Sequence, residues 1–220
     1  MSLPLKPTLG EIRSQIQTRL GFGMAGNAQI VNSGLIDDFI RGAQEALYVD
    51  YDWLELKAVY ERSTGVNQQY YDYPPDCNIE RITSISILWN GQYVPLKEGI
   101  QLSDRGIAPG TIPCKYERRT QIELWPVPQS SDYKLRFEYE RTLLSLVNSS
   151  DPLSLPGEMV KLYALANAKA HYRQPDADRY ASQLNSMLIK LKSRQRTQGV
   201  WSRSNRTPDP YASVSSDQVV

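Results

Sequence analysis

The chain has 220 residues, of which 40% are hydrophobic, and a formal net charge of +1 at pH 7. This length and composition fit one globular domain with an insertion, or two small domains. The near-zero net charge excludes an overall attraction to nucleic acid or to a membrane, so charged contacts must be local. The first residues, MSLPLKPTLGEIR, lack a signal-peptide pattern, and no run of about 18 apolar residues occurs, so we expect a cytosolic protein without a membrane span.

Two amphipathic helices are predicted at the start of the chain. Thr8 and Glu11 form a capping box, and apolar residues at spacings of three and four then predict a helix from about residue 9 to Leu20. Asn32 or Ser33 can cap a second helix. We expect the apolar stripe of this helix to be buried, with these members: Leu35, Ile36, Phe39, Ile40, Ala43 and Leu47. We expect the opposite, polar side to face water, with these members: Asp37, Asp38, Arg41 and Gln44.

A β region is predicted after Asp50, where the hydrophobic period changes to two. Leu54, Leu56, Ala58 and Tyr60 alternate with more polar residues, as in a half-buried strand. A strand from about Ile79 to Trp89 then meets Asn90-Gly91, a strong hairpin signal because both residues tolerate a positive φ. With the segments CKYERR, TQIELWPV and DYKLRFEYERT, the pattern predicts an antiparallel region of about five or six strands.

Two further helices are predicted after the β region. Ser154 and Pro156 signal the start of the first, which ends before Pro175, and Asp176 precedes a longer one. The predicted fold class is α+β: a small helical bundle from both chain ends with an inserted antiparallel β lobe and an extended C-terminal tail. The expected regions are residues 1–52 (N-terminal helices), 53–148 (β region), 149–198 (C-terminal helix hairpin) and 199–220 (tail).

The sequence contains no recognisable catalytic or cofactor motif. The single histidine, His171, lies in a predicted helix without a nucleophile turn. Two carboxylate pairs, Asp50 with Asp52 and Glu138 with Glu140, have the spacing of a shared face but are more typical of solvated surfaces. Cys77 and Cys114 lack zinc-site or CxxC spacing, so we expect reduced, structural thiols. We therefore predict a non-enzymatic protein with no catalytic residues, cofactor or metal.

A basic run without acidic residues lies between Asp178 and Asp209. Helix-dipole stabilisation can account for its first four members, which form a basic surface that could meet phosphate or an acidic protein: Lys190, Lys192, Arg194 and Arg196. Helix-dipole stabilisation does not account for Arg203 and Arg206, which lie in the polar tail near Trp201 and Tyr211. We predict that these four residues anchor the tail to a partner: Trp201, Arg203, Arg206 and Tyr211.

Tyrosine is abundant (14 residues) and phenylalanine scarce (3 residues). Tyrosine combines apolar area with a polar tip, which suits surfaces that are wet before assembly and buried after it. Tyrosine also favours strands, so the β region alone could explain its abundance. The composition fits a subunit of a larger assembly but leaves both readings open.

The organisation of the chain resembles the head-to-tail adaptor proteins of short-tailed bacteriophages, which are related to the head-tail connector family. The resemblance rests on the helix pair ending in Leu47, Tyr51 and Trp53, the YPPD step before the NGQY hairpin, and the helix hairpin LPGEMVKLYALANAKAHYRQPDADRYASQL. It implies a structural protein of the virion neck, assembled in the host cytoplasm as a dodecameric ring. The ring would lie under the portal protein, receive the tail nozzle or tail tube protein, and surround the DNA channel.

Other functions remain open from the sequence. A tail-nozzle, stopper or tail-terminator subunit would be equally poor in motifs. A nucleic-acid-binding module would use the basic run with exposed aromatic residues, and would show salt-sensitive binding to DNA. A polysaccharide-active enzyme would lose glycan cleavage when Glu138 or Glu140 is neutralised.

Overall fold

The computed structural model describes residues 6–21, 33–106 and 112–196. These residues form an α+β fold, as predicted, with four α-helices and eight strands. The helices are α1 (Leu9–Arg19), α2 (Ser33–Asp50), α3 (Gly157–His171) and α4 (Ala177–Arg196). The strands are β1 (Lys57–Ser63), β2 (Tyr70–Tyr71), β3 (Cys77–Trp89), β4 (Gln92–Pro95), β5 (Lys97–Glu98), β6 (Lys115–Arg118), β7 (Ile122–Trp125) and β8 (Lys134–Arg141).

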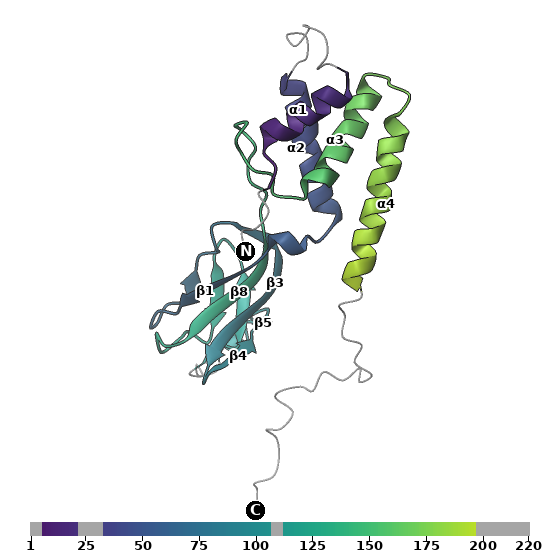
Figure 1. Cartoon of the computed structure of the whole chain (residues 1–220). Coiled ribbons are helices and arrows are strands. Elements are labelled where there is room, and N and C mark those ends of the chain that lie inside the picture. The colour runs from purple at the N-terminus through teal and green to yellow at the C-terminus, as the bar shows by residue number, and fades with distance from the viewer. Residues whose placement is uncertain (1–5, 22–32, 107–111, 197–220) are drawn as a thin grey trace, which may run out of the picture.

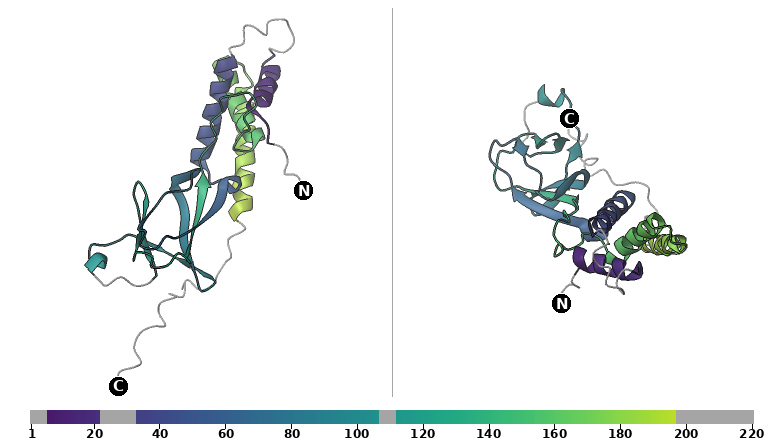
Figure 2. Two further views of the ribbon diagram at one scale, coloured as in Figure 1. Left: turned by 90° about the vertical axis from the view of Figure 1, so that its left-hand side faces the viewer. Right: turned by 90° about the horizontal axis from the view of Figure 1, so that it is seen from above.

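The helices gather at one end of the molecule and the strands at the other (Figure 1). We call α1–α4 the helical lobe and β1–β8 the β lobe. In the helical lobe α2, α3 and α4 stand in a row with α3 in the middle, and α1 crosses beside them (Figure 2). No helix in the described part of the chain has the length and apolar character needed to cross a membrane. The four region boundaries given above stay a prediction.

The first helix forms as its capping box predicts. The Thr8 side chain accepts a hydrogen bond from the Glu11 amide, and the Glu11 carboxylate accepts one from the Thr8 amide. Its apolar side chains are buried against α2 and α3 in one core. The helix and its buried face therefore follow directly from local sequence.

The predicted water-facing side of α2 is wrong at two positions. Asp37 and Gln44 are 8% and 3% exposed. Arg13 of α1 donates to both carboxylate oxygens of Asp37 at 2.6 Å, and the side-chain oxygen Oε1 of Gln44 accepts from the Ser154 backbone amide at 3.0 Å. These polar side chains are buried because a neighbouring element supplies each with a partner, which helical periodicity cannot reveal.

The β lobe contains two four-stranded sheets, in the orders β1-β8-β3-β4 and β2-β7-β6-β5. The first sheet is antiparallel throughout, whereas β5 and β6 pair in parallel. The strands outnumber the five or six expected because β2 and β5 have only two residues each, too few to show a period. Inward-facing residues of both sheets, including Phe137 and Tyr71, form a core distinct from that of the helices.

The predicted hairpin is confirmed, and one predicted strand begins later than expected. Asn90 and Gly91 have φ values of 48° and 78° and connect β3 with β4, as a two-residue turn of this type requires. Leu54–Leu56 forms a 3₁₀ turn, and β1 begins only at Lys57. The alternation at Leu54 and Leu56 therefore belongs to a helical turn that buries Leu56 in the helical core.

The start of α3 approaches the N-terminal segment very closely. A Cβ atom at Gly157 would lie 2.2 Å from Pro7 Cγ. The Pro7 carbonyl accepts from the Leu153 amide at 3.0 Å, so this segment cannot shift without losing that bond. Gly157→Ala is therefore expected to lower the free energy of unfolding by about 1–3 kcal/mol, measured by chemical denaturation.

Gly42, in the middle of α2, is the matched control for this substitution. A Cβ atom there meets nothing within 4 Å, so Gly42→Ala should raise stability by roughly 0.5–1 kcal/mol through helix propensity alone. Equal effects of the two substitutions would contradict the close contact between Gly157 and Pro7.

Candidate functional site

The predicted basic surface on α4 is divided between two sides of the helix. Lys190 is exposed and lines a groove, whereas the Lys192 ammonium lies 5.8 Å from the centre of the Tyr51 ring. Residues two apart on an α-helix point about 200° from each other, so the two lysines cannot share one face. The side chains of Arg194 and Arg196 lie outside the described residues, and their part in a basic surface stays a prediction.

The groove has a volume of about 740 Å³ and runs along α4 beside α1 and α3. Its basic side chains are Arg19, Arg179 and Lys190, and its acidic member, Glu158, pairs with Lys161. We call it the α4 groove and define it by these lining residues: Arg19, Glu158, Leu162, Arg179, Tyr180, Ser182, Gln183, Ser186, Met187 and Lys190. Its lining thus holds more basic than acidic side chains, together with the apolar side chains of Leu162, Tyr180 and Met187.

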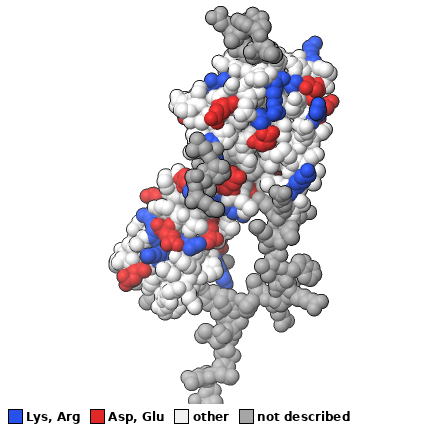
Figure 3. All heavy atoms as spheres, in the orientation of Figure 1, with Lys and Arg blue, Asp and Glu red and all other residues white. Residues whose placement is uncertain are grey.

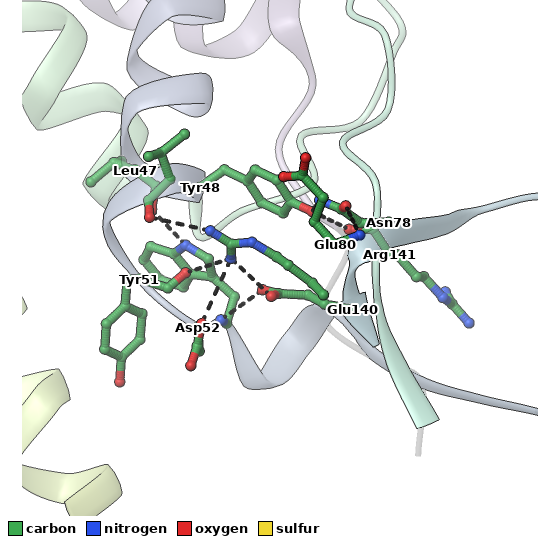
Figure 4. A network of polar contacts seen from close by, with 11 residues as sticks. Leu47, Tyr48, Tyr51, Asp52, Asn78, Glu80, Glu140 and Arg141 are labelled. Carbon is green, nitrogen blue, oxygen red and sulfur yellow. Dashed lines mark hydrogen bonds and ion pairs between the residues drawn. The ribbon is translucent and has the colours of Figure 1, made fainter. Parts of the chain in front are cut away.

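The second candidate feature is the junction between the lobes, where Arg81 of β3 donates hydrogen bonds to backbone carbonyls at and just beyond the end of α2. Figure 4 shows Tyr48, Tyr51 and Glu140 at this junction. Arg81 Nη1 donates to Glu140 Oε2 at 2.8 Å, and Glu140 is only 5% exposed. The guanidinium also lies 4.4 Å from the centre of the Tyr48 ring and donates to the Val49 carbonyl at 3.2 Å. One arginine of the β lobe thus binds a buried carboxylate and the last turn of α2.

Trp53 completes the junction from the segment that joins the lobes. Its amide donates to Glu140 Oε1 at 3.0 Å, and its indole Nε1 donates to the Leu47 carbonyl at 2.8 Å. Both oxygens of the Glu140 carboxylate are therefore hydrogen-bonded, one to each partner, so the buried charge is compensated. On the other side, Tyr48 Oη accepts from the Asn78 amide group at 2.6 Å.

Tyr51 lies at the same junction and faces α4 (Figure 4). Its ring packs edge-on to Trp53 at 5.1 Å, and its hydroxyl is buried without a hydrogen-bond partner among the described residues. Burial raises the pKa of the Tyr51 hydroxyl, with a further contribution from Asp52. In the sequence, Tyr51 and Trp53 are distinguished only by their place at the end of the first helix pair. The contacts that they make could not be found because their partners lie in distant elements.

The carboxylate pairs do not form an acid–base site in the structure. Glu140 is bound by Arg81, and Glu138 lies on the outer face of its sheet, where it accepts from Arg136 Nε at 3.2 Å. Asp50 and Asp52 are exposed at the end of α2. Because Glu138 and Glu140 are each paired with a different arginine, the structure gives them the environment of structural ion pairs.

The remaining reactive side chains are separated from one another. His171 is exposed, and its ring packs against Phe39 at 5.6 Å and Tyr172 at 5.2 Å. Cys77 is buried, and burial raises the pKa of its thiol to about 11, with a contribution from Asp76, whereas Cys114 is exposed; both are free. Within the described ranges, no group of three or more His, Cys, Asp or Glu side chains is placed to hold a metal ion.

Aromatic side chains serve both as core and as surface in the β lobe. Tyr71 and Tyr139 are buried between the sheets, whereas Trp89, Tyr93 and Tyr70 are 42%, 41% and 48% exposed. On the outer face of the first sheet, the Tyr93 hydroxyl donates to Glu61 at 2.7 Å. Acidic and basic side chains are interspersed over the visible face of both lobes (Figure 3), in keeping with the small net charge.

The predicted tail anchors Trp201, Arg203, Arg206 and Tyr211 lie outside the described residues, so the tail stays a prediction. The described residues define an α+β protein whose candidate functional features are an exposed groove and a rigid junction rather than a set of reactive side chains around a substrate pocket.

The model of the SU10 adaptor protein family matches residues 7–208. The chain belongs to this family, and it is a phage adaptor protein of the virion. A comparison with curated proteins gave no match. The family match confirms the resemblance to phage adaptor proteins, while the assignment to short-tailed phages stays a prediction.

Proposed function

We propose that the chain is a non-enzymatic subunit of the virion neck, which forms a ring joining the portal protein to the tail nozzle or tail tube protein. In this proposal the tail, residues 199–220, docks on the portal. The observation that carries it is the match to an adaptor family over residues 7–208, because that match includes both lobes and extends into the tail.

The junction between the lobes supports a position between two partners. A subunit that contacts one partner with each lobe requires a fixed arrangement of its lobes. Arg81, Glu140 and Trp53 connect the β lobe to α2 through hydrogen bonds of 2.8–3.0 Å in a mostly buried site. Such a junction holds two surfaces at a fixed spacing, one on each lobe, as a protein between two partners requires.

The composition of the tail supports docking on a partner. Trp201, Arg203 and Arg206 lie inside the residues that match the family, and Tyr211 lies just beyond them. Tryptophan, tyrosine and arginine are the residues that most often dominate binding energy at protein interfaces. A segment that orders only on docking would keep the isolated subunit monomeric until the portal is present.

Native mass spectrometry of the full chain, alone and mixed with the portal ring of the same phage, tests the proposal. We expect a monomer alone, and a complex in which the chain adds in about the copy number of the portal. Alanine at Trp201, Arg203, Arg206 and Tyr211 together should reduce portal occupancy by about tenfold or more.

Ser213→Ala with Ser215→Ala is the matched control in the same tail, and should leave occupancy unchanged. Rings that form without the portal and do not bind it would indicate a tail-nozzle, stopper or tail-terminator subunit instead. Salt-sensitive binding of DNA by the isolated chain, without portal binding, would indicate a nucleic-acid-binding module. DNA binding by the portal-bound ring would assign the basic residues to the channel.

A further inference from the structure

Strand β1 forms one edge of the first sheet and is the longest edge strand of the β lobe. It pairs with β8 over all seven residues, Lys57–Ser63, without a break in register. In Figure 1 the strands β1, β8 and β3 follow one another across the sheet, with β1 outermost. Within the described residues, the outer side of β1 is therefore open to another strand.

The hydrogen bonds to β8 show which main-chain groups of β1 face outward. The Thr64 amide donates to the Tyr133 carbonyl at 2.9 Å, one residue beyond the last pair of the β1–β8 register. Hydrogen-bonded and non-hydrogen-bonded pairs alternate in an antiparallel ladder, so the even-numbered residues of β1 bond to β8. Val59, Glu61 and Ser63 then direct their amides and carbonyls away from β8. The edge thus presents a donor and an acceptor at every second residue.

The other three edge strands of the β lobe are short, and one of them lacks a donor. Strands β2 and β5 have two residues each, and β4 has four. Because the Leu96 amide bonds to Ile85 of β3, the main chain of β4 faces outward at Tyr93 and Pro95. The proline nitrogen carries no hydrogen. Short strands and proline are common protections against unwanted strand pairing, and β1 has neither.

The side chains along β1 define the kind of strand that fits beside it. On the outer face of the sheet, Val59 is 52% exposed and lies between Lys57 and Glu61, which carry opposite charges. On the inner face, Tyr60 packs against Phe137 at 6.3 Å but is still 37% exposed. An antiparallel strand would fit best with an acidic residue opposite Lys57, an apolar residue opposite Val59 and a basic residue opposite Glu61. An apolar residue on its inner face would cover Tyr60.

We propose that β1 receives an extended segment of the partner on the side of the ring away from the portal, and that this segment joins the first sheet as an antiparallel strand. The segment would carry basic, apolar and acidic residues at alternate positions. Main-chain hydrogen bonds supply the affinity, and the charges on either side of Val59 select the sequence and the register. The inference rests on the proposed function, in which residues 199–220 bind the portal and leave the β lobe for the other partner.

Hydrogen exchange at single-amide resolution tests the proposal on the unaltered chain. The states compared are the free full chain, the chain on the portal ring, and the chain in the complete neck and tail isolated from the same phage. The amides of Val59 and Glu61 should exchange rapidly in the first two states and at least about 100-fold more slowly in the third. The Tyr60 amide bonds to β8 and should be protected in all three. Protection gained at alternate residues is the signature of an added strand, since burial under side chains would slow neighbouring amides alike.

A proline substitution tests whether the outward amide is needed. Val59→Pro removes an amide hydrogen that faces away from β8, so the urea midpoint should stay nearly unchanged. Attachment of the tail-side protein to the portal-bound ring, measured by native mass spectrometry, should fall by about 30-fold or more, because a carbonyl of the added strand would lose its donor. Val59→Ala is the matched control. It shortens the same side chain but keeps the amide, and should reduce attachment by less than about fivefold.

Failure of this inference can be told from failure of portal docking. Full portal occupancy with rapid exchange at Val59 and Glu61 in the complete neck and tail would overturn strand addition and leave the proposed function intact. Protection that is already present on the portal ring would assign the added strand to the portal or to a neighbouring copy, and would overturn the tail-side partner. Protection in the complete neck and tail, without binding of the free chain to the portal ring, would support strand addition and contradict portal docking. Equal attachment of Val59→Pro and Val59→Ala would also overturn strand addition.

Discussion

Arg81→Met is expected to lower the free energy of unfolding by about 3–5 kcal/mol, because it would leave the Glu140 carboxylate buried without its charged partner. Glu140 is 5% exposed and would retain only the hydrogen bond from the Trp53 amide at 3.0 Å. Methionine preserves much of the apolar volume of the arginine stem, so the loss of stability would come from the lost charge rather than from a cavity. Urea denaturation at pH 7 measures the free energy of unfolding of both proteins.

A matched control is available on the surface of the β lobe. Arg118 pairs with Glu98, and the two side chains are 32% and 46% exposed. Because water solvates both groups, Arg118→Met should cost less than about 1 kcal/mol. If the two substitutions destabilised the protein equally, the junction would contribute no more than an exposed ion pair, and the rigid connection between the lobes would be refuted.

The elements that sequence predicted best are those whose signals are local. The capping box at Thr8 and Glu11 marks the start of α1, and the Asn90-Gly91 turn marks the hairpin between β3 and β4. In both cases the interacting groups lie within four residues, so the chain carries the whole signal in one place. The short strands β2 and β5 were missed because they form only against distant partners.

The polar core residues could not be predicted from periodicity. The alternation in β8 places Glu138 and Glu140 on one face of the sheet, and this pattern alone predicts that both are solvated. Glu140 is buried by the junction, and its partner Arg81 lies 59 residues away in the chain. Asp37 is likewise buried by Arg13 of another helix. Only the packing of separate elements decides which member of a polar pattern becomes buried.

The candidate surfaces depend on three-dimensional placement in the same way. The α4 groove combines side chains from α1, α3 and α4, and its basic residue Arg19 comes from α1, far from the basic run that the sequence showed. Within that run, Lys190 and Lys192 point to different sides of α4. A cluster of charges in sequence therefore did not correspond to a cluster in space.

Phe137→Ala is expected to destabilise the protein by about 3–5 kcal/mol, because it creates a cavity in the middle of the β lobe. Phe137 is fully buried on β8, which pairs with β1 on one side and with β3 on the other. Tyr60, opposite Phe137 on β1, is the matched control. It is 37% exposed, so Tyr60→Ala should cost only about 1 kcal/mol.

The response of the helices to Phe137→Ala is the stronger part of this prediction. β8 carries both Phe137 and Glu140, so loss of the sheet would also remove the carboxylate that binds Arg81 and Trp53 beneath α2. We therefore expect helical circular dichroism and tryptophan fluorescence to report one transition, shifted to lower urea by the same amount. Helices that stay folded after the fluorescence change would show that the lobes unfold independently. The junction would then position the lobes without coupling their stability.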